Sequence, residues 1–273
     1  MTAMTTSPAP RIRIEVRDAV GTVEISNPAR HNALSVAMMT ELAAALRALS
    51  EDSDVRVVVL RGAGERAFVS GADISEFPSR QDDAARQAAD DAATTLFTQL
   101  SALPVPVIAR IHGYCLGAGM ALALGADLRY ADTRSVLAIP AARLGVGYPL
   151  EQTAALVQTV GPAAASDLLF TGRRIAAVEA YAMGLVDRVV EPAELGKIVD
   201  DVAETIAANA PLSVRAAKAS IRAVRRLSEG DAAAGSAALG LATEAVARCR
   251  TSHDLREGAL AFLEKRPAHF TGR

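Results

Sequence analysis

Two glycine-containing turns carry the residues with the clearest chemical potential. Residues 71–74 read Gly-Ala-Asp-Ile after a short apolar segment, and residues 117–119 read Gly-Ala-Gly before an apolar helical segment. A backbone N–H at the start of a helix has no partner within the helix and lies at the positive end of its dipole. Two such groups that converge would stabilise negative charge developing on an oxygen, as an oxyanion hole does. Taken singly, each glycine cluster is better explained as a tight turn.

Several side chains near these turns could move or donate a proton. Asp73 is expected to bond nearby backbone N–H groups, with a role as a base as the alternative. Glu151 falls in the first turn of a predicted helix, where the helix dipole alone accounts for an acid; a catalytic base is the alternative. Tyr114 and Tyr148 are expected to be buried with satisfied hydroxyls, and donation to a substrate is the alternative. His112 follows an apolar strand and is expected to be a hydrogen-bonded core residue.

The segments that position these residues predict an α/β core followed by helices. The predicted strands cover residues 11–17, 22–25, 55–60, 67–69 and 107–111, from period-two patterns or short apolar runs. The predicted helices cover residues 35–49, 81–100, 120–125, 195–208, 212–227, 232–250 and 255–265. Strand pairs followed by a helix indicate βα crossovers. The expected division is a disordered leader over residues 1–10, a core over 11–205 and a helical region over 206–273.

Composition narrows the function classes. The chain has 273 residues, of which 51% are hydrophobic and 22% charged, which is typical of a globular protein. A net charge of −2 argues against nucleic acid as a partner. Cys115 and Cys249 are far apart, and we expect two inert thiols in a reducing compartment. No metal-ligand spacing, P-loop or GxGxxG motif is present. No apolar stretch is long enough to span a bilayer, so we expect no membrane span and a cytoplasmic protein.

The motifs together resemble those of the crotonase (enoyl-CoA hydratase/isomerase) family, from Arg11 to Phe270. The segments that carry the resemblance are residues 27–34, 67–74, 113–119, 126–131, 171–175, 179–180, 184–186 and 262–266. The resemblance implies a spiral of ββα units, a C-terminal helical trimerisation region and a homotrimer or hexamer. It also implies an acyl-CoA thioester as substrate, in fatty-acid or related acyl-CoA metabolism. Coenzyme A would be part of that substrate, with no separate cofactor and no metal.

The resemblance also assigns the site. The thioester carbonyl would accept hydrogen bonds from the N–H groups of Ala72 and Ala118, where the family usually has glycine at the second position. The glycines before them, Gly71 and Gly117, shape the two turns. The remaining implied contacts are Asp73, Ile74 and Ser75 near the adenine and pantetheine, Arg30 and His31 near the CoA phosphates, and Phe262 and Lys265 reaching the nucleotide of a neighbouring subunit. For His31, a surface role is an equal alternative.

The sequence departs from the family at the two residues that would perform hydration. Similar proteins use two glutamates to deprotonate water and to protonate the α-carbon, and the matching positions here are Ala121 and Ala141. Positioned acid–base catalysis is worth roughly 10²–10⁴ in rate, so we expect negligible hydratase activity.

Two hypotheses follow from this departure. The first is an enzyme, a crotonase-family lyase or isomerase, that uses the oxyanion hole and a different acid or base, with Glu151 as the best candidate. The second is a non-catalytic acyl-CoA-binding carrier or regulator.

Overall fold

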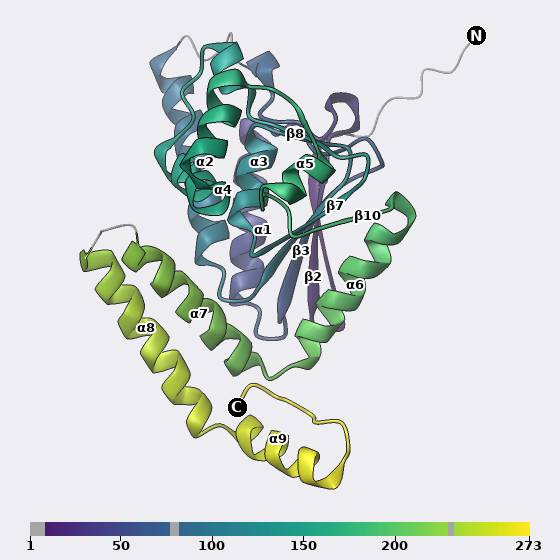
Figure 1. Ribbon diagram of the computed structural model, residues 1–273, viewed down its shortest axis with the longest axis vertical. Coiled ribbons are helices and arrows are strands. Elements are labelled where there is room, and N and C mark those ends of the chain that lie inside the picture. The colour runs from purple at the N-terminus through teal and green to yellow at the C-terminus, as the bar shows by residue number, and fades with distance from the viewer. Residues whose placement is uncertain (1–8, 77–81, 229–231) are drawn as a thin grey trace.

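The computed structural model describes residues 9–76, 82–228 and 232–273. The predicted leader over residues 1–10 therefore lies almost entirely outside the described residues. Figure 1 shows a body of sheets and helices from which three C-terminal helices extend.

The larger sheet has six strands in the order β1-β2-β3-β5-β7-β10. Their bounds are Arg11–Arg17, Val20–Ser26, Val57–Gly62, Val107–Ile111, Leu128–Asp132 and Arg188–Val190. β1 and β2, both predicted as strands, form an antiparallel hairpin, and every other pairing in this sheet is parallel. The apolar runs in β3 and β5 are buried because helices cover both faces of the sheet.

The smaller sheet has four strands in the order β4-β6-β8-β9. Their bounds are Ala67–Val69, Tyr114–Leu116, Val136–Ala138 and Ile175–Ala176. The chain places one strand in the larger sheet and the next in the smaller sheet, and then forms a helix. It does so three times, as β3-β4-α2, β5-β6-α3 and β7-β8-α4. This repetition is the ββα spiral that the resemblance implied.

Helices cover the larger sheet on its two faces. The helices α1 to α6 span Val36–Glu51, Asp83–Ala102, Ala118–Gly125, Leu150–Thr171, Ala177–Ala182 and Pro192–Ala208. The main apolar core includes side chains of α1 to α4. On the opposite face, Leu195 and Val199 of α6 pack against Val57, Val59 and Ile108. Ser35 caps α1, accepting a hydrogen bond from the N–H of Met38 at 3.2 Å.

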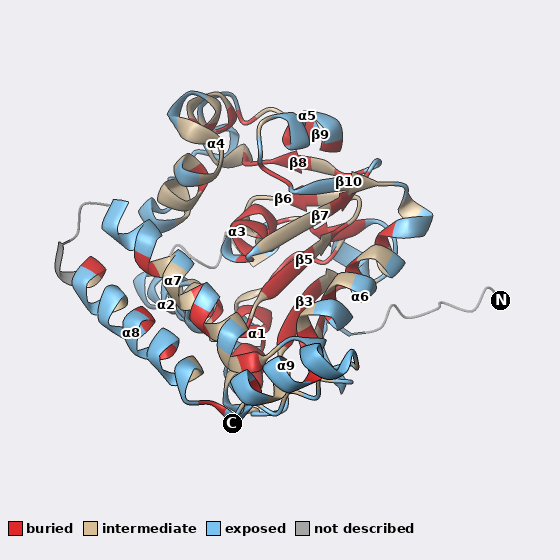
Figure 2. Ribbon diagram, turned by 60° about the horizontal axis from the view of Figure 1, so that its bottom comes forward, coloured by how far each residue is buried: buried red, intermediate tan, exposed pale blue. Residues whose placement is uncertain are grey.

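The C-terminal helices form an arm beside this body (Figure 1). They are α7 (Pro211–Ser228), α8 (Ala232–Arg250) and α9 (His253–Glu264). α7 and α8 lie side by side, and much of their surface is exposed in Figure 2. The predicted boundary at residue 205 falls within α6, which packs on the sheet to Ala207. In the described part of the chain, no helix combines the length and apolar character that crossing a membrane requires.

Candidate active site

The first glycine turn presents the N–H of Ala72 away from its neighbouring strand. Leu34 forms a parallel bridge with Ala72 by donating its N–H to the Gly71 carbonyl at 2.8 Å and accepting the Asp73 N–H at 2.8 Å. In such a bridge the middle residue keeps its own N–H and C=O free of the partner. Within the described residues, the Ala72 N–H has no hydrogen-bond partner.

The second turn begins α3 and lies against the first. Gly117 has φ +51°, a region that favours glycine, and it donates its N–H to the Ala138 carbonyl at 3.0 Å. Ala118 is the first residue of α3, so its N–H has no acceptor within the helix, and none is found elsewhere in the described residues. A Cβ on Gly117 would lie 3.7 Å from the Cα of Gly71. The two glycine turns are therefore in contact.

Close packing brings α3 onto the end of β4. A Cβ on Gly119 would lie 2.2 Å from the carbonyl oxygen of Val69, which is closer than any side chain allows. Only glycine at this position lets the start of α3 approach the strand that leads into Gly71. The sequence Gly-Ala-Gly thus supplies both the turn and the close contact that set the start of α3 against the Gly71 turn.

Asp73 is a structural carboxylate at the first turn, as expected. It accepts the backbone N–H of Ser75 at 3.0 Å and its hydroxyl at 2.8 Å, and it pairs with Arg30 at 2.5 Å. Arg30 also contacts the Ser75 hydroxyl. Burial alone would raise the pKa of Asp73, but the bonds from Ser75 and Arg30 outweigh it, so the pKa lies below its ordinary value. Arg30 is thus engaged in holding the turn, while Ile74 is 61% exposed beside it.

A ring cluster with adjacent positive charge lies next to this turn. The His31 ring stacks on Tyr114 with 6.1 Å between centroids, and the Arg174 guanidinium lies 5.9 Å from the Tyr114 centroid. His31 has φ +50° and accepts the Ser70 N–H through its carbonyl. His31 is therefore half-buried and close to the candidate site. This position is compatible with contact to a ligand and with a surface role.

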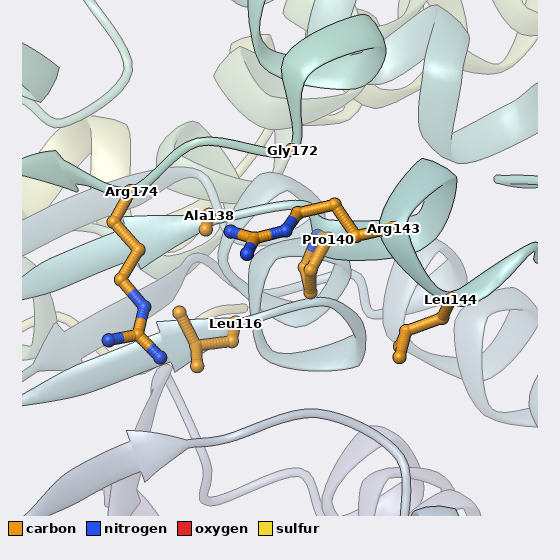
Figure 3. Close-up of a pocket in the computed structure, with 7 residues that line it drawn as sticks. All are labelled: Leu116, Ala138, Pro140, Arg143, Leu144, Gly172 and Arg174. Carbon is orange, nitrogen blue, oxygen red and sulfur yellow. The ribbon is translucent and has the colours of Figure 1, made fainter.

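A cavity of about 310 Å³ opens beside the second turn (Figure 3). It is lined by Leu116, Ala138, Pro140, Arg143, Leu144, Gly172 and Arg174. Leu116 directly precedes Gly117, and Pro140 directly precedes Ala141. In Figure 3 the Arg143 and Arg174 side chains extend along the apolar part of the lining. The cavity therefore combines apolar walls with two guanidinium groups.

The two alanines that the resemblance places where similar proteins have glutamates, Ala121 and Ala141, lie around this region. Ala121 is in α3, one turn after Ala118, and its side chain is buried. Ala141 is half-buried in the 3-10 helix η4 (Pro140–Leu144) and packs against the main core. Each side chain is a methyl group that transfers no proton.

Two expectations about polar side chains are wrong. The Tyr148 hydroxyl is buried with no hydrogen-bond partner among the described residues, although its ring packs in the core as expected. The His112 Nε2 is likewise buried without a partner there, although its backbone carbonyl accepts the Phe68 N–H. Burial lowers the pKa of His112 and favours its neutral form.

The other predicted residues lie as follows. Glu151 is in the first turn of α4, as predicted, and its side chain is exposed. Phe262 and Lys265 are exposed at the end of α9, which lies apart from α3 in Figures 1 and 2. They do not reach the site of their own chain. The Cys115 thiol is buried, and burial raises its pKa, as expected for an inert thiol.

Sequence reasoning missed three residues. Arg143 and Arg174 line the cavity, but local sequence does not show that residues 31 positions apart share a wall. Gln152 has a buried Oε1 atom with no partner in the described residues. Gln152 lies in the first turn of α4, and no local sequence pattern marks it.

Comparison with known proteins identifies the family. Residues 15–273 match the family model described as enoyl-CoA hydratase/isomerase. The chain is 34% identical over 253 residues to a short-chain-enoyl-CoA hydratase of Clostridium acetobutylicum, covering 93% of this chain and 94% of that protein. It is 33% identical over 264 residues to a crotonyl-CoA hydratase of Syntrophomonas wolfei, covering 96% and 98%.

The fold is also found among solved structures. A crystal structure of an enoyl-CoA hydratase/carnithine racemase from Magnetospirillum magneticum matches with a TM-score of 0.87 and 35% identity, covering 96% of each chain. The family match and these relatives agree with the ββα spiral. The chain belongs to the enoyl-CoA hydratase/isomerase family.

Proposed function

We propose that this protein binds acyl-CoA thioesters, with the thioester carbonyl oxygen accepting hydrogen bonds from the N–H groups of Ala72 and Ala118. The observation that carries the proposal is the contact between the Gly71 and Gly117 turns, each followed by an unpartnered N–H. The relatives named as hydratases of enoyl-CoA compounds support the same ligand class.

The surroundings of the turns suit the rest of such a ligand. The cavity beside Gly117 offers apolar walls to an acyl or pantetheine chain, and Arg143 and Arg174 offer charge to phosphates. Arg30 acts indirectly here, because it fixes Asp73 and Ser75 and so fixes the turn that presents the Ala72 N–H. Phe262 and Lys265 would contribute only to the site of another subunit.

The chemistry that remains is stabilisation of an enolate or tetrahedral oxyanion. Each donor of an oxyanion hole is worth about 10²–10³ in rate when such a charge develops. Hydration needs an acid and a base in addition, and the alanines at 121 and 141 supply neither. An enzyme of this type would therefore depend on another proton carrier, for which Glu151 is the sequence candidate.

A non-catalytic binder is the second candidate function. The specific observation in its favour is that the Glu151 side chain is exposed. The positive end of the α4 dipole suffices to explain an acidic residue in the first turn of that helix. In this case the protein keeps the thioester site as a carrier or regulator.

Calorimetry with acetyl-, octanoyl- and palmitoyl-CoA tests the ligand class, and at least one should bind saturably. Ala118→Pro removes one donor at the first helical position, where proline is tolerated because the N–H has no helical acceptor. It should weaken binding about five-fold, since one net hydrogen bond contributes about 1 kcal/mol. Ala118→Gly keeps the N–H and is the matched control. Absence of binding by all three thioesters at millimolar concentration would refute the proposal.

Isotope exchange separates the enzyme from the binder. A base that removes an α-proton from a bound thioester leaves an enolate, which takes up deuterium when it is reprotonated in heavy water. If Glu151 is the base, the protein should exchange the α-proton of a bound thioester and Glu151→Gln should abolish exchange without altering affinity. Exchange that survives in Glu151→Gln would exclude this residue as the base. No exchange with any bound thioester would favour the carrier.

A further inference from the structure

A second cavity, of about 410 Å³, adjoins the opposite end of β3 from the glycine turns. It is lined by residues of the β1–β2 turn, the loop before β3, the start of α7 and residues 271–273. The candidate active site follows β3 and β4 along the chain, whereas Arg56, which lines this cavity, directly precedes β3. A six-residue strand is about 20 Å long. The two cavities share no lining residue, so they are separate sites.

This cavity lies where the C-terminal arm meets the body. Gly272 lies against the start of α7, where a Cβ on Gly272 would be 3.5 Å from the Cβ of Pro211. Arg56 ties these segments to β3, because it donates Nη1 to the Ala207 carbonyl at the end of α6 and Nη2 to the Phe270 carbonyl, both at 2.8 Å. A ligand held in the cavity would therefore contact the body and the arm at once.

Two guanidinium groups of the lining have no acidic partner. Arg215 of α7 donates Nη2 to the carbonyl of Val55, the neighbour of Arg56, at 3.4 Å. Within the described residues this is the one bond made by its five N–H donors. The Nε of Arg215 is buried without a partner there, and its Nη1 is unbonded but not buried. Arg56 bonds to neutral carbonyls, and neither side chain forms an ion pair in the described part of the chain.

The charges around the cavity favour an anion as its ligand. The lining carries the guanidinium groups of Arg56, Arg215 and Arg273 and one carboxylate side chain, that of the exposed Asp54. The main-chain oxygen of Arg273 is already engaged, because it accepts the N–H of His253 at the start of α9. Positive charge that is partly withdrawn from water is costly without a counter-charge.

The geometry of a guanidinium narrows the ligand further. Its planar donors suit phosphate and carboxylate oxygens, which accept two of its N–H groups at once. Such a group would bond to the free donors of Arg215 and would offset the charge of Arg56. The volume of the cavity is typical of a small-molecule site.

We propose that this cavity binds a small molecule that carries a phosphate or carboxylate group, and that the bound anion fastens the arm to the body. Arg215 is the main contact, and Arg56 contributes positive charge. The inference goes beyond the proposed acyl-CoA site and does not depend on it.

The test is calorimetric titration of the full chain with inorganic phosphate and with citrate, at constant ionic strength. At least one should bind saturably at millimolar concentration, and the tighter of the two identifies the group as phosphate or carboxylate. Arg215→Gln should weaken that binding at least ten-fold, because hydrogen bonds to charged groups are worth a factor of ten or more. Arg215→Lys keeps the charge but loses the planar donors, so its affinity should lie between. Arg47→Gln removes an exposed charge of α1 outside the cavity and is the matched control.

Hydrogen exchange tests the effect on the arm. The anion that binds should slow amide exchange in residues 211–215 and 270–273 of the parent protein, since a ligand that spans two segments reduces their local opening. The same concentration should have no such effect on Arg215→Gln. Binding that leaves exchange in these residues unchanged would contradict the fastening of the arm.

The remaining outcomes separate this cavity from the candidate active site. Failure of both anions to bind at millimolar concentration, or equal binding by the parent and Arg215→Gln, would overturn the proposal. Ala118→Pro should leave anion affinity unchanged; a loss in that variant would place the anion at the glycine turns instead. Thermal melts of each variant establish that the comparison is made on folded protein.

Discussion

At the scale of single residues, the candidate site depends on groups that hold the backbone rather than on groups that touch a ligand. Asp73 gathers three donor contacts from Ser75 and Arg30, and Leu34 fixes the residues on both sides of Ala72. A backbone donor is effective only when its direction is set in advance. The carboxylate of Asp73 therefore matters for the position of an N–H that it does not contact.

Asp73→Asn should show this role in stability and in its pH dependence. Hydrogen bonds to a charged group contribute about 1.5–3 kcal/mol, so the variant should unfold more easily at pH 7. Since the folded-state pKa of Asp73 is below the unfolded value of 3.8, its contribution is complete above 3.8 and is lost as the pH falls through the folded-state value. Denaturation of both proteins from pH 7 to 2 should show the difference shrinking at the acid end. A constant difference across that range would contradict this account.

The two alanines allow a gain-of-function test. Ala121→Glu with Ala141→Glu should raise crotonyl-CoA hydration from near background by roughly 10²–10⁴, because an acid and a base would join the donors proposed at Ala72 and Ala118. Each single change should do less, since acid and base act as a unit. Ala121 is buried, so its replacement should also lower the melting temperature. Efficient hydration by the unaltered protein would show that the missing glutamates are not essential.

At the scale of elements, α7 is attached to the body by basic side chains that bond to strand ends. Lys218 donates its Nζ to the Val105 carbonyl and to Asp127 Oδ2, both at 2.6 Å, and Arg222 donates to the Leu103 carbonyl at 2.7 Å. Burial lowers the pKa of Lys218 to about 8 despite the opposing charge of Asp127. The segment before β5 is thereby fixed by a helix that follows it by about 110 residues.

Lys218→Met, which keeps the apolar stem, should destabilise the protein by about 1–3 kcal/mol, because the Val105 carbonyl loses a buried donor. Asp127 keeps its bond from the Val107 N–H, so the loss should stay within this range. Lys197→Met is the control, since Lys197 pairs with Asp201 on the surface, where a pair contributes well under 1 kcal/mol. Urea unfolding of both variants makes the comparison. Equal effects would mean that α7 is held mainly by its apolar contacts.

The elements predicted from sequence are those with a long local pattern. The hairpin, β3, β5, α1 and the C-terminal helices all match a predicted segment. The strands β6 to β10, which have two to five residues and pair with strands distant in sequence, were not predicted. Their hydrophobic patterns are too short to be recognised in a sequence. These segments form strands mainly because they pair with strands that are distant in sequence. The kink at Gly161 in α4 was not predicted either.

The same limit applies to the site. The glycine turns at 71 and 117 could be identified as possible donors, but their contact follows from the pairing of β4 with β6. The Tyr148 hydroxyl was expected to be satisfied because most buried hydroxyls are. Which polar atoms remain unpaired depends on packing from several elements, and a single sequence does not contain that information in readable form.

At the scale of the whole molecule, the arm of α7 to α9 exposes large apolar side chains on each of its helices. Val224 on α7, Leu241 on α8 and Phe262 on α9 are 67%, 68% and 83% exposed. Contiguous exposed apolar surface usually marks an interface between proteins. Closed symmetric assemblies bury such a face without leaving a copy of it free to recruit further chains.

We therefore expect a trimer or a hexamer, with a mass by light scattering of three or six times that of one chain. Val224→Asp combined with Leu241→Asp should shift the mass toward that of a single chain, because burying two carboxylates in an apolar interface costs several kcal/mol. Val178→Asp, equally exposed but on α5 in the body, is the control and should leave the mass unchanged. If Phe262 and Lys265 complete a neighbour's site, loss of assembly should also weaken acyl-CoA binding, although Ala72 and Ala118 are intact. A monomer at every concentration would contradict the interface, and a double variant that becomes monomeric but binds acyl-CoA unchanged would contradict the shared site.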